Sequence, residues 1–340
     1  MTNHNPNQNS STSAGASAPT LADVLAARQV VDKHLRRTPF LHPIALGQAL
    51  GLDVYLKCEN MQPTGAFKVR GGVNLFARLP RAELERGVVT ASTGNHGQSI
   101  AFAGRAFGIP VTIYAPEKAN AFKIKAMQNL GATVVQEGAT YDDSVVNGQA
   151  RARRDGLRYV SATDEPLLIA GVGTAYLEML EEEPGLDTFI VPLGGGSNAC
   201  GACIVAKTIN PKARVIAVQA AGAPAFYNSF KAGHVTSTET VNTFADGLAT
   251  RAAYDLPFGI LSRMLDDVVL VSDDEIAEAI ALLMDTTHQL AEGAGAAPVA
   301  AARKLAPQVK GRKVGLMLSG GNVTMDIVAQ ALKIRGADWS

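Results

Sequence analysis

The chain has 340 residues, of which 47% are hydrophobic and 18% charged, so it is long enough to bury a substantial core, as two lobes rather than one. Lysine plus arginine equals aspartate plus glutamate at 31 each, which leaves no net field to favour nucleic acid or an anionic membrane surface. The three cysteines are too few for a disulfide framework at this length, and a reducing cytoplasm fits them best.

The start of the chain is polar and low in complexity. It lacks the basic region and apolar core of a secretion signal, and we expect residues 1–20 to form a disordered tail. No uninterrupted apolar run approaches the roughly 20 residues that a membrane helix needs, so we expect no membrane span.

Short apolar segments rich in β-branched residues alternate with longer segments of helical period. The expected strands are 53–58, 87–92, 110–115, 133–138, 157–162, 188–193, 214–220, 267–272 and 313–319. Helices are expected at 97–108, 120–131 and 272–291, the last capped by Ser272. This alternation is typical of a doubly wound α/β fold with mainly parallel sheets. We expect a small domain at 80–165, inserted into a large domain formed by 21–79 and 166–340.

A triple-glycine loop follows the strand expected at 188–193. Ligands of open α/β sheets sit beyond the carboxyl ends of strands, where helix N-termini present backbone N–H groups to anions. This loop, which predicts a phosphate site, consists of Gly194, Gly195, Gly196, Ser197 and Asn198. A plain strand-to-helix turn would explain the same residues. The loop has neither the G-x-G-x-x-G spacing of dinucleotide sites nor the G-K-[ST] ending of nucleotide loops, which argues against NAD and ATP.

Two further strand ends carry similar turns. The turn after the strand at 87–92 offers hydroxyls, an amide and N–H groups to a small anion such as an amino-acid carboxylate, and is formed by Ser92, Thr93, Gly94, Asn95 and His96. A cluster of helix-capping residues would have the same composition. The last expected strand ends in "LSGGN", which includes Ser319 and Asn322.

One lysine, Lys68, lies between Phe67 and the small or glycine positions of "GAFKVRGG". A lysine can bind an aldehyde as a Schiff base, so three glycine-rich turns and this lysine together indicate pyridoxal phosphate (PLP). Because an unperturbed lysine has a pKa of about 10.4, its site must be nearly dry, cationic or apolar to free the amine. A solvated surface charge is the competing interpretation of a single lysine.

The motifs "PTGAFKVRGG", "STGNHGQS", "GGGSN", "FADGLA", "EGAGAA" and "LSGGN" occur in the order in which they resemble the fold-type II PLP enzymes, in the branch of threonine/serine dehydratases and serine racemases. The resemblance covers about residues 20–335. It implies a tryptophan synthase β-like fold of two open doubly wound α/β domains, with PLP in the cleft between them.

The resemblance implies a role for each matching position. Lys68 would carry the cofactor and act as the base at the substrate Cα, and Phe67 would lie beside the pyridine ring. The other implied cofactor contacts are Asn95 at the ring hydroxyl, Gly194, Gly195, Gly196, Ser197 and Asn198 at the phosphate, Ser319 at the pyridine nitrogen and Glu292 near the ring. The implied substrate contacts are Ser92, Thr93, Gly94, Asn95 and His96 at the carboxylate, and Asp246 and Gly247 beside the side chain.

The implied reaction is β-elimination from a β-hydroxy-α-amino acid, which yields a 2-oxo acid and ammonia. Ser319 favours it, because a neutral hydroxyl stabilises a pyridinium less than a carboxylate does and so disfavours a long-lived carbanion. The expected enzyme is an ammonia-lyase that resembles catabolic threonine dehydratases. The sequence to residue 340 leaves no room for the C-terminal regulatory domain of biosynthetic dehydratases.

Two departures from the family pattern bear on activity. Metal-stimulated relatives carry carboxylates after the strand at 214–220, where this chain has Gln219, Ala223 and Ala225, and we expect no Mg²⁺ or Ca²⁺ there. Thr93 occupies the position of the racemase serine that acts on the opposite face of the substrate, so Thr93 is a second catalytic candidate. An amino-acid racemase with dehydratase side activity is therefore an alternative function.

Two more hypotheses are a PLP-binding pseudoenzyme, which the intact Lys68, Asn95 and Ser319 argue against, and a cysteine synthase-like enzyme, whose lysine motif differs. Cys200 and Cys203 have zinc-like spacing, but a single pair in a small-residue helix favours packing. The substrate stays open among threonine, serine, 3-hydroxyaspartate and a bulky aryl serine such as phenylserine. The resemblance also implies a homodimer or higher homo-oligomer.

Overall fold

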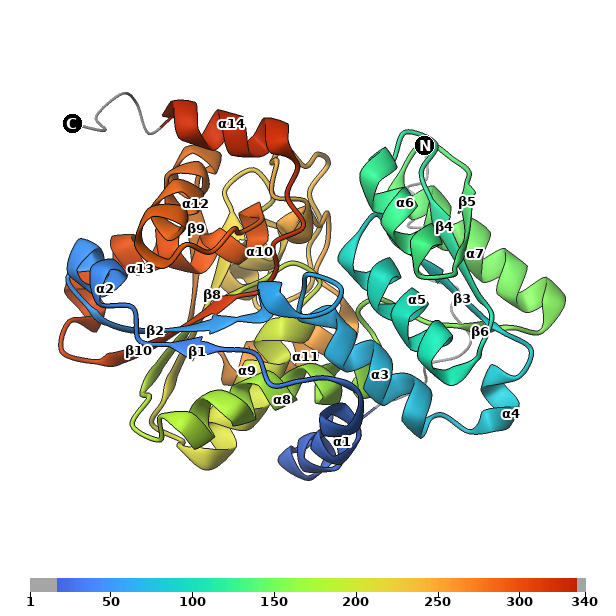
Figure 1. Cartoon of the computed structure of the whole chain (residues 1–340), viewed down its shortest axis with the longest axis horizontal. Helices are drawn as coiled ribbons and strands as arrows, with labels where there is room; N and C mark the ends of the chain where they lie inside the picture. The colour runs from blue at the N-terminus through green and yellow to red at the C-terminus, as the bar shows by residue number, and fades with distance from the viewer. Residues whose placement is uncertain (1–16, 335–340) are drawn as a thin grey trace.

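The structure of the protein is a computed structural model that describes residues 17–334 (Figure 1). Residues 1–16 of the expected tail therefore lie outside the described residues. Within residues 17–20, Pro19 is buried and Thr20 caps the first helix by accepting from the backbone N–H of Asp23. No helix in the described part of the chain is long and apolar enough to span a bilayer.

The strands form two separate sheets. They are β1 (Phe40–Leu41), β2 (Asp53–Cys58), β3 (Val88–Ala91), β4 (Val111–Ala115), β5 (Thr133–Gln136), β6 (Arg158–Tyr159), β7 (Thr188–Pro192), β8 (Arg214–Ala220), β9 (Asp267–Val271) and β10 (Lys313–Leu318). The large sheet has the order β1-β2-β10-β7-β8-β9, and the small sheet has the order β5-β4-β3-β6. All pairings are parallel except that of β1 with β2.

All nine expected strands are confirmed, with ends that differ by a few residues at most. The sequence missed β1, which has only two residues and so carries no readable alternation. The doubly wound α/β fold is confirmed. The domain boundaries 21–79, 80–165 and 166–340 stay a prediction, which the separation of the strands into two sheets supports.

Helices connect and cover the strands. Those before β3 are α1 (Leu21–His34), α2 (Ile44–Leu50), α3 (Lys68–Arg78) and α4 (Arg81–Leu84), with the 3₁₀ turn η1 (Glu59–Met61). Those among the strands of the small sheet are α5 (Asn95–Phe107), α6 (Ala121–Asn129) and α7 (Tyr141–Asp155). The remainder are α8 (Pro166–Glu182), α9 (Ser197–Ile209), α10 (Ala225–Ala232), η2 (Asp246–Leu248), α11 (Asp255–Met264), α12 (Asp273–Thr287), α13 (Gly293–Val309) and α14 (Met325–Ile334).

The expected helices are confirmed as α5, α6 and α12. Ser272 caps α12 as predicted, through a capping box in which it accepts from the N–H of Glu275 and the Glu275 carboxylate accepts from the N–H of Ser272. In Figure 1 the helices α8, α9 and α11 lie on one face of the large sheet and α12 and α13 on the other. The small sheet has α7 on one face and α5 and α6 on the other.

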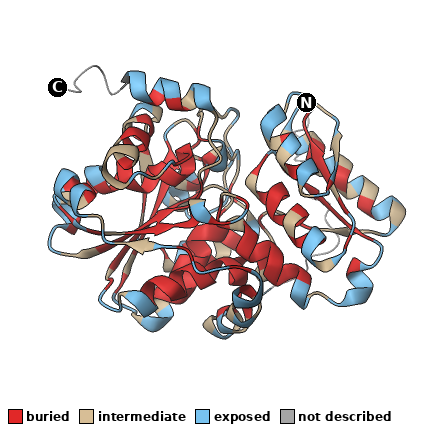
Figure 2. Cartoon of the chain, in the orientation of Figure 1, coloured by how far each residue is buried: buried red, intermediate tan, exposed pale blue. Residues whose placement is uncertain are grey.

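We call the large sheet with the helices packed on it the large lobe, and the small sheet with its helices the small lobe. Buried residues gather in the large lobe where α3, α8 and the large sheet meet (Figure 2). The three thiols Cys58, Cys200 and Cys203 are free and buried, and the last two lie in one apolar cluster of α9, which confirms packing as their role. Burial raises the pKa of Cys58 and Cys203 to about 12, so neither is a reactive thiolate near neutral pH.

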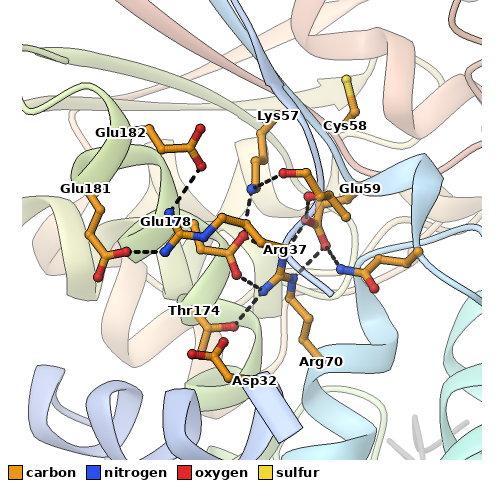
Figure 3. Close-up of polar contacts among 12 residues, drawn as sticks. Asp32, Arg37, Lys57, Cys58, Glu59, Arg70, Thr174, Glu178, Glu181 and Glu182 are labelled. Atoms are coloured by element: carbon orange, nitrogen blue, oxygen red, sulfur yellow. Dashed lines mark hydrogen bonds and ion pairs between the residues drawn. The ribbon is translucent and has the colours of Figure 1, made fainter. Parts of the chain in front are cut away.

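A buried ionic network joins β2, η1, α3 and α8 (Figure 3). The Arg70 guanidinium donates to both oxygens of Glu59 and both oxygens of Glu178, at 2.7–2.8 Å. Lys57 Nζ lies 2.6 Å from Glu178 Oε2 and donates to the backbone oxygen of Thr38 at 2.8 Å. Two cations thus balance two carboxylates in a region without solvent. This network fixes the start of α3, which carries Lys68.

Candidate active site

Lys68 is the first residue of α3 and points toward the triple-glycine loop. Its Nζ donates to Ser197 Oγ at 2.9 Å and to the backbone oxygen of Ala162 at 3.5 Å, and lies 5.4 Å from the centre of the Phe67 ring. The side chain is only half-buried by area, but its amine faces protein groups, and burial lowers the pKa of Lys68 to about 8. Roughly a tenth of the amine is therefore neutral at pH 7, far more than for an unperturbed lysine.

The segment before Lys68 is paired with the turn that follows β10. Phe67 N–H donates to the Ser319 carbonyl at 2.9 Å, Gly321 N–H donates to the Gly65 carbonyl at 2.9 Å, and Ala66 forms an antiparallel bridge with Gly320. Ser319 is 2% exposed. The predicted proximity of Phe67, Lys68 and Ser319 is thus present in the structure.

The triple-glycine loop lies between β7 and α9. Gly196 has φ 98°, a left-handed conformation that favours glycine, and it precedes the N-terminus of α9. Tyr176 Oη donates to Asn198 Oδ1, which turns Asn198 Nδ2 the other way, and this buried Nδ2 has no hydrogen-bond partner among the described residues. A helix N-terminus with an unpaired buried donor fits an anionic group such as a phosphate.

The second predicted loop lies between β3 and α5. Ser92 Oγ accepts from the N–H groups of Gly94 and Gly97 at 3.1 and 2.8 Å, so this side chain shapes the loop, and its contact with substrate stays a prediction. Thr93 is exposed. The loop places the first N–H groups of α5 where they can bind a carboxylate.

His96 is buried beneath this loop. Thr90 Oγ1 donates its hydrogen to the Val160 carbonyl at 2.8 Å, so it must accept from His96 Nε2 at 2.9 Å. Burial, with a smaller effect from Lys68, lowers the pKa of His96 to about 3. A neutral His96 with its hydrogen on Nε2 therefore supports the loop from below.

Asn95, at the start of α5, is held between two residues of the large lobe. Its Nδ2 donates to Glu292 Oε1 at 2.7 Å, and its Oδ1 accepts from Asn322 Nδ2 at 2.7 Å. Asn322 Nδ2 also donates to the Thr64 carbonyl at 2.8 Å. These bonds link the small lobe to residues 64–67, the segment that precedes Lys68 and is called the Lys68 segment below.

Protonation of Glu292 makes the free energy of unfolding depend on pH. Burial, and to a smaller extent Asp246, raises the pKa of Glu292 from 4.5 to about 7, against the opposing effects of Lys123 and Asn95. Between these two pH values the folded chain keeps a proton that the unfolded chain has released. The contribution of Glu292 to the free energy of unfolding is therefore fully present below pH 4.5, and it is lost as the pH rises toward and through 7.

We expect Glu292→Gln to abolish this loss, because glutamine stays neutral and its oxygen can still accept from Asn95. From pH 4.5 to 8 the free energy of unfolding of the wild type should fall, relative to the variant, by roughly 3 kcal/mol. Urea denaturation of both proteins across this range measures the difference, with the exposed Glu239→Gln as the matched control. Parallel pH profiles for wild type and Glu292→Gln would contradict the assignment.

Of the two residues predicted beside the substrate side chain, Asp246 and Gly247, the first contacts the small lobe and the second contacts the triple-glycine loop. Asp246 Oδ2 lies 2.5 Å from Lys123 Nζ of α6, and the two side chains are 58% and 13% exposed. The Gly247 carbonyl lies where it would overlap a Cβ on Gly194, so only glycine allows this approach. The large-lobe loop thus contacts both the triple-glycine loop and the small lobe.

We expect Lys123→Met to raise KM about two- to fivefold with little change in kcat, because methionine keeps the packing over Gly94 but loses an ion pair between the lobes. Added salt should raise KM of the wild type and not of the variant. Steady-state kinetics at two ionic strengths measure this, with the exposed Lys125→Met of the same helix as control. If KM of Lys123→Met equalled that of the wild type and responded equally to salt, the Lys123–Asp246 pair would have no role in substrate binding.

The structure brings most of the predicted residues together. Those with direct contacts to one another are Lys68 with Phe67 and Ser197, Asn95 with Glu292, Gly194 with Gly247 and Phe67 with Ser319. The sequence missed Lys123 as a partner of Asp246 and Asn322 as a partner of Asn95. Asn322 belongs to the "LSGGN" motif and so had a signal. Nothing in the sequence pointed to Lys123, because it lies on a short helix with no recognisable motif.

The site fits a phosphorylated aldehyde cofactor. A lysine amine with a lowered pKa can bind the aldehyde, and it lies 2.9 Å from the Oγ of Ser197, which directly follows the three glycines and begins α9. Gln219, at the position expected to lack a metal, has its side-chain oxygen occupied by the N–H of Tyr227 at 2.8 Å.

Comparison with known proteins agrees with this geometry. The family model described as pyridoxal-phosphate dependent enzyme matches residues 31–320. L-threonine ammonia-lyase of Thermotoga maritima is 39% identical over 310 residues, which cover 91% of this chain and 77% of that protein. Serine racemase of Dictyostelium discoideum is 36% identical over 317 residues, 92% of this chain and 98% of that protein.

Among solved structures, processed threonine deaminase isoform 2 from Solanum lycopersicum superposes with a TM-score of 0.87 at 31% identity, and covers 93% of this chain and 87% of that one. The predicted fold, the PLP cofactor and the enzyme class, an ammonia-lyase resembling threonine dehydratases, are confirmed. The chain belongs to the pyridoxal-phosphate dependent enzymes, in the branch of threonine/serine dehydratases and serine racemases.

Proposed function

We propose that this enzyme eliminates water from a small β-hydroxy-α-amino acid, threonine or serine. The enamine left by elimination becomes an imine, which takes up one water to give a 2-oxo acid and ammonia. The observation that carries the proposal is the placement of Lys68 Nζ 2.9 Å from the Oγ of Ser197, the residue that directly follows the three glycines. PLP, when bound, supplies an electron sink for the pair of electrons left when the Cα proton departs.

Lys68 is the residue that moves protons. With a pKa of about 8, its freed amine can accept the Cα proton, and the resulting ammonium can return a proton to the departing β-hydroxyl. When PLP is bound, Ser197 and the backbone of Gly194–196 would hold its phosphate, and Asn95 would donate to its ring hydroxyl. Ser319 would offer a neutral hydroxyl to its pyridine nitrogen.

The carboxylate of the substrate is proposed to bind the loop formed by Thr93, Gly94 and the start of α5. The electrostatics beside it favour a neutral side chain, because the Lys123 cation is already paired with Asp246 and a second carboxylate would meet the Asp246 charge. Threonine and serine therefore suit this place better than 3-hydroxyaspartate. The relatives give no support to an aryl-serine preference or to a non-catalytic role.

Release of 2-oxo acid and ammonia from threonine, serine, 3-hydroxyaspartate and phenylserine tests the proposal. We expect threonine or serine to give the highest kcat/KM, with one 2-oxo acid formed per ammonia. Absence of ammonia from all four, in protein that contains stoichiometric PLP, would rule the elimination out.

Racemisation is the second candidate, because Thr93 provides an exposed hydroxyl in the proposed substrate loop and two of the relatives are named serine racemase. Recovery of substrate from D₂O separates the two. If substrate with deuterium at an inverted Cα forms faster than ammonia is released, racemisation is the main activity.

We also propose a homodimer or higher homo-oligomer in the cytoplasm. The free state of the buried thiols Cys58, Cys200 and Cys203 supports a reducing compartment. Light scattering after size-exclusion chromatography determines the oligomeric state, and a single species with the mass of one chain would contradict the proposal.

A further inference from the structure

We propose that Asn322 is a positioning residue whose amide fixes the orientation of the Asn95 amide, so that Asn95 presents an N–H donor, not its oxygen, to the cofactor ring. The inference rests on the proposed function, in which Asn95 contacts the ring hydroxyl. Asn322 follows β10 and lies at the junction of the Lys68 segment with the small lobe.

The orientation of Asn322 is determined by a group that can only accept. Its side-chain partner in the Lys68 segment is the Thr64 carbonyl, at 2.8 Å. A carbonyl has no hydrogen to donate, so Asn322 must turn Nδ2 toward it. Gly65 makes room for the other end of the amide: a Cβ there would lie 2.6 Å from Asn322 Oδ1, and its φ of +68° favours glycine.

The orientation of Asn95 follows from that of Asn322. The second Nδ2 hydrogen of Asn322 points to the side chain of Asn95 at 2.7 Å, so the Asn95 atom that faces it must be the oxygen. Asn95 Nδ2 then faces Glu292 Oε1, also at 2.7 Å. One hydrogen of Asn95 Nδ2 is used by Glu292, and the second is left for a ligand.

Glu292 alone could not enforce this arrangement. Its pKa of about 7 means that its carboxyl is protonated in a large fraction of molecules near neutral pH, and a protonated carboxyl can donate as well as accept. A reversed Asn95 amide would then also satisfy Glu292, because the two ends of a carboxamide have nearly the same shape. Asn322, whose donor role is set by the backbone, removes this ambiguity.

Asn322→Asp tests the inference, because aspartate has the same shape and no donor. The matched control is Asn60→Asp: Asn60 Nδ2 donates to Gln289 Oε1 and the Leu290 carbonyl, and Asn60 makes no hydrogen bond to Asn95. The readouts are the dissociation constant for PLP and the pH midpoint of the visible absorbance band of the PLP-loaded enzyme. A donor to the ring oxygen stabilises its ionised form and so lowers that midpoint.

We expect Asn322→Asp to raise the midpoint by about one pH unit and to weaken PLP binding about tenfold, while Asn60→Asp changes neither by more than about a third of that. In an Asn95→Ala background the Asn322→Asp substitution should produce no further shift of the midpoint. If Asn322→Asp does not fold, Asn322→Ala is measured instead, in the wild-type and the Asn95→Ala backgrounds. We expect it to shift the pH midpoint in the same direction by a smaller amount.

An unshifted midpoint in both Asn322 variants, or a shift of equal size in the Asn95→Ala background, would overturn the inference. The proposed function fails differently, since it is lost if the wild type binds PLP but releases no ammonia from any of the four amino acids. If the wild type releases ammonia but Asn322→Asp leaves the pH midpoint unchanged, only the proposed role of Asn322 is wrong.

Discussion

Lys68→Ala is expected to reduce kcat/KM for ammonia release by roughly 10⁴-fold, the upper end of what a positioned general base contributes. The amine of Lys68 lies 2.9 Å from Ser197 Oγ, and its pKa of about 8 suits proton transfer near neutral pH. In the proposed reaction the same amine removes the Cα proton and returns one to the leaving hydroxyl, so its loss affects more than one step.

Lys68→Arg tests whether the positive charge of Lys68 is sufficient for activity. Arginine keeps the cation beside Ser197 but stays protonated, so it can neither bind the aldehyde nor accept a proton. We expect activity as low as in Lys68→Ala, with the visible absorbance of lysine-bound PLP absent from both variants. The exposed Lys125→Ala should retain full activity. Activity in Lys68→Arg within tenfold of the wild type would show that another group is the base.

Arg70→Met is expected to lower the free energy of unfolding by about 3–5 kcal/mol, the range for a broken buried ion pair. Arg70 pairs with Glu59 and Glu178 (Figure 3). All three side chains are at most 1% exposed. Burial alone would lower the pKa of Arg70, but the two carboxylates hold it above its usual range, and the same pairing keeps the pKa of Glu59 below normal. Without Arg70, the two carboxylates would face only Lys57.

Chemical denaturation measures this loss, with Arg78→Met as the matched control. Arg78 ends the same helix and is exposed, so its substitution should change stability by less than about 0.5 kcal/mol. Because Arg70 is two positions from Lys68, Arg70→Met should also weaken PLP binding. A loss of stability under 1 kcal/mol would show that the network tolerates one missing cation.

The sequence predicted the sheets well because buried parallel strands are mostly apolar and rich in β-branched residues, as in β8, where six of seven residues are buried and only Gln219 among those six is polar. The glycine loops were equally readable, since their function depends on backbone conformation. Gly196 and Gly65 have positive φ in the structure, and such positions favour glycine in the sequence itself.

What the sequence could not indicate are contacts between residues far apart in the chain. Lys57 and Arg70 resemble ordinary surface charges, because their partner Glu178 is more than 100 positions away. Lys123 and Asp246 belong to different lobes, and the hydrogen bond of Asn322 to Asn95 spans 227 positions. Such pairs depend on how the two lobes meet, which no local pattern encodes.

The most direct test of the cofactor's attachment is to reduce the PLP-containing enzyme with borohydride, digest it and locate the modified residue by mass spectrometry. Reduction makes a lysine–cofactor bond permanent. We predict the cofactor on Lys68 in nearly every molecule, and none on Lys57 or Lys123. Cofactor found on another lysine, or Lys68 recovered unmodified from protein that contains PLP, would contradict the central claim.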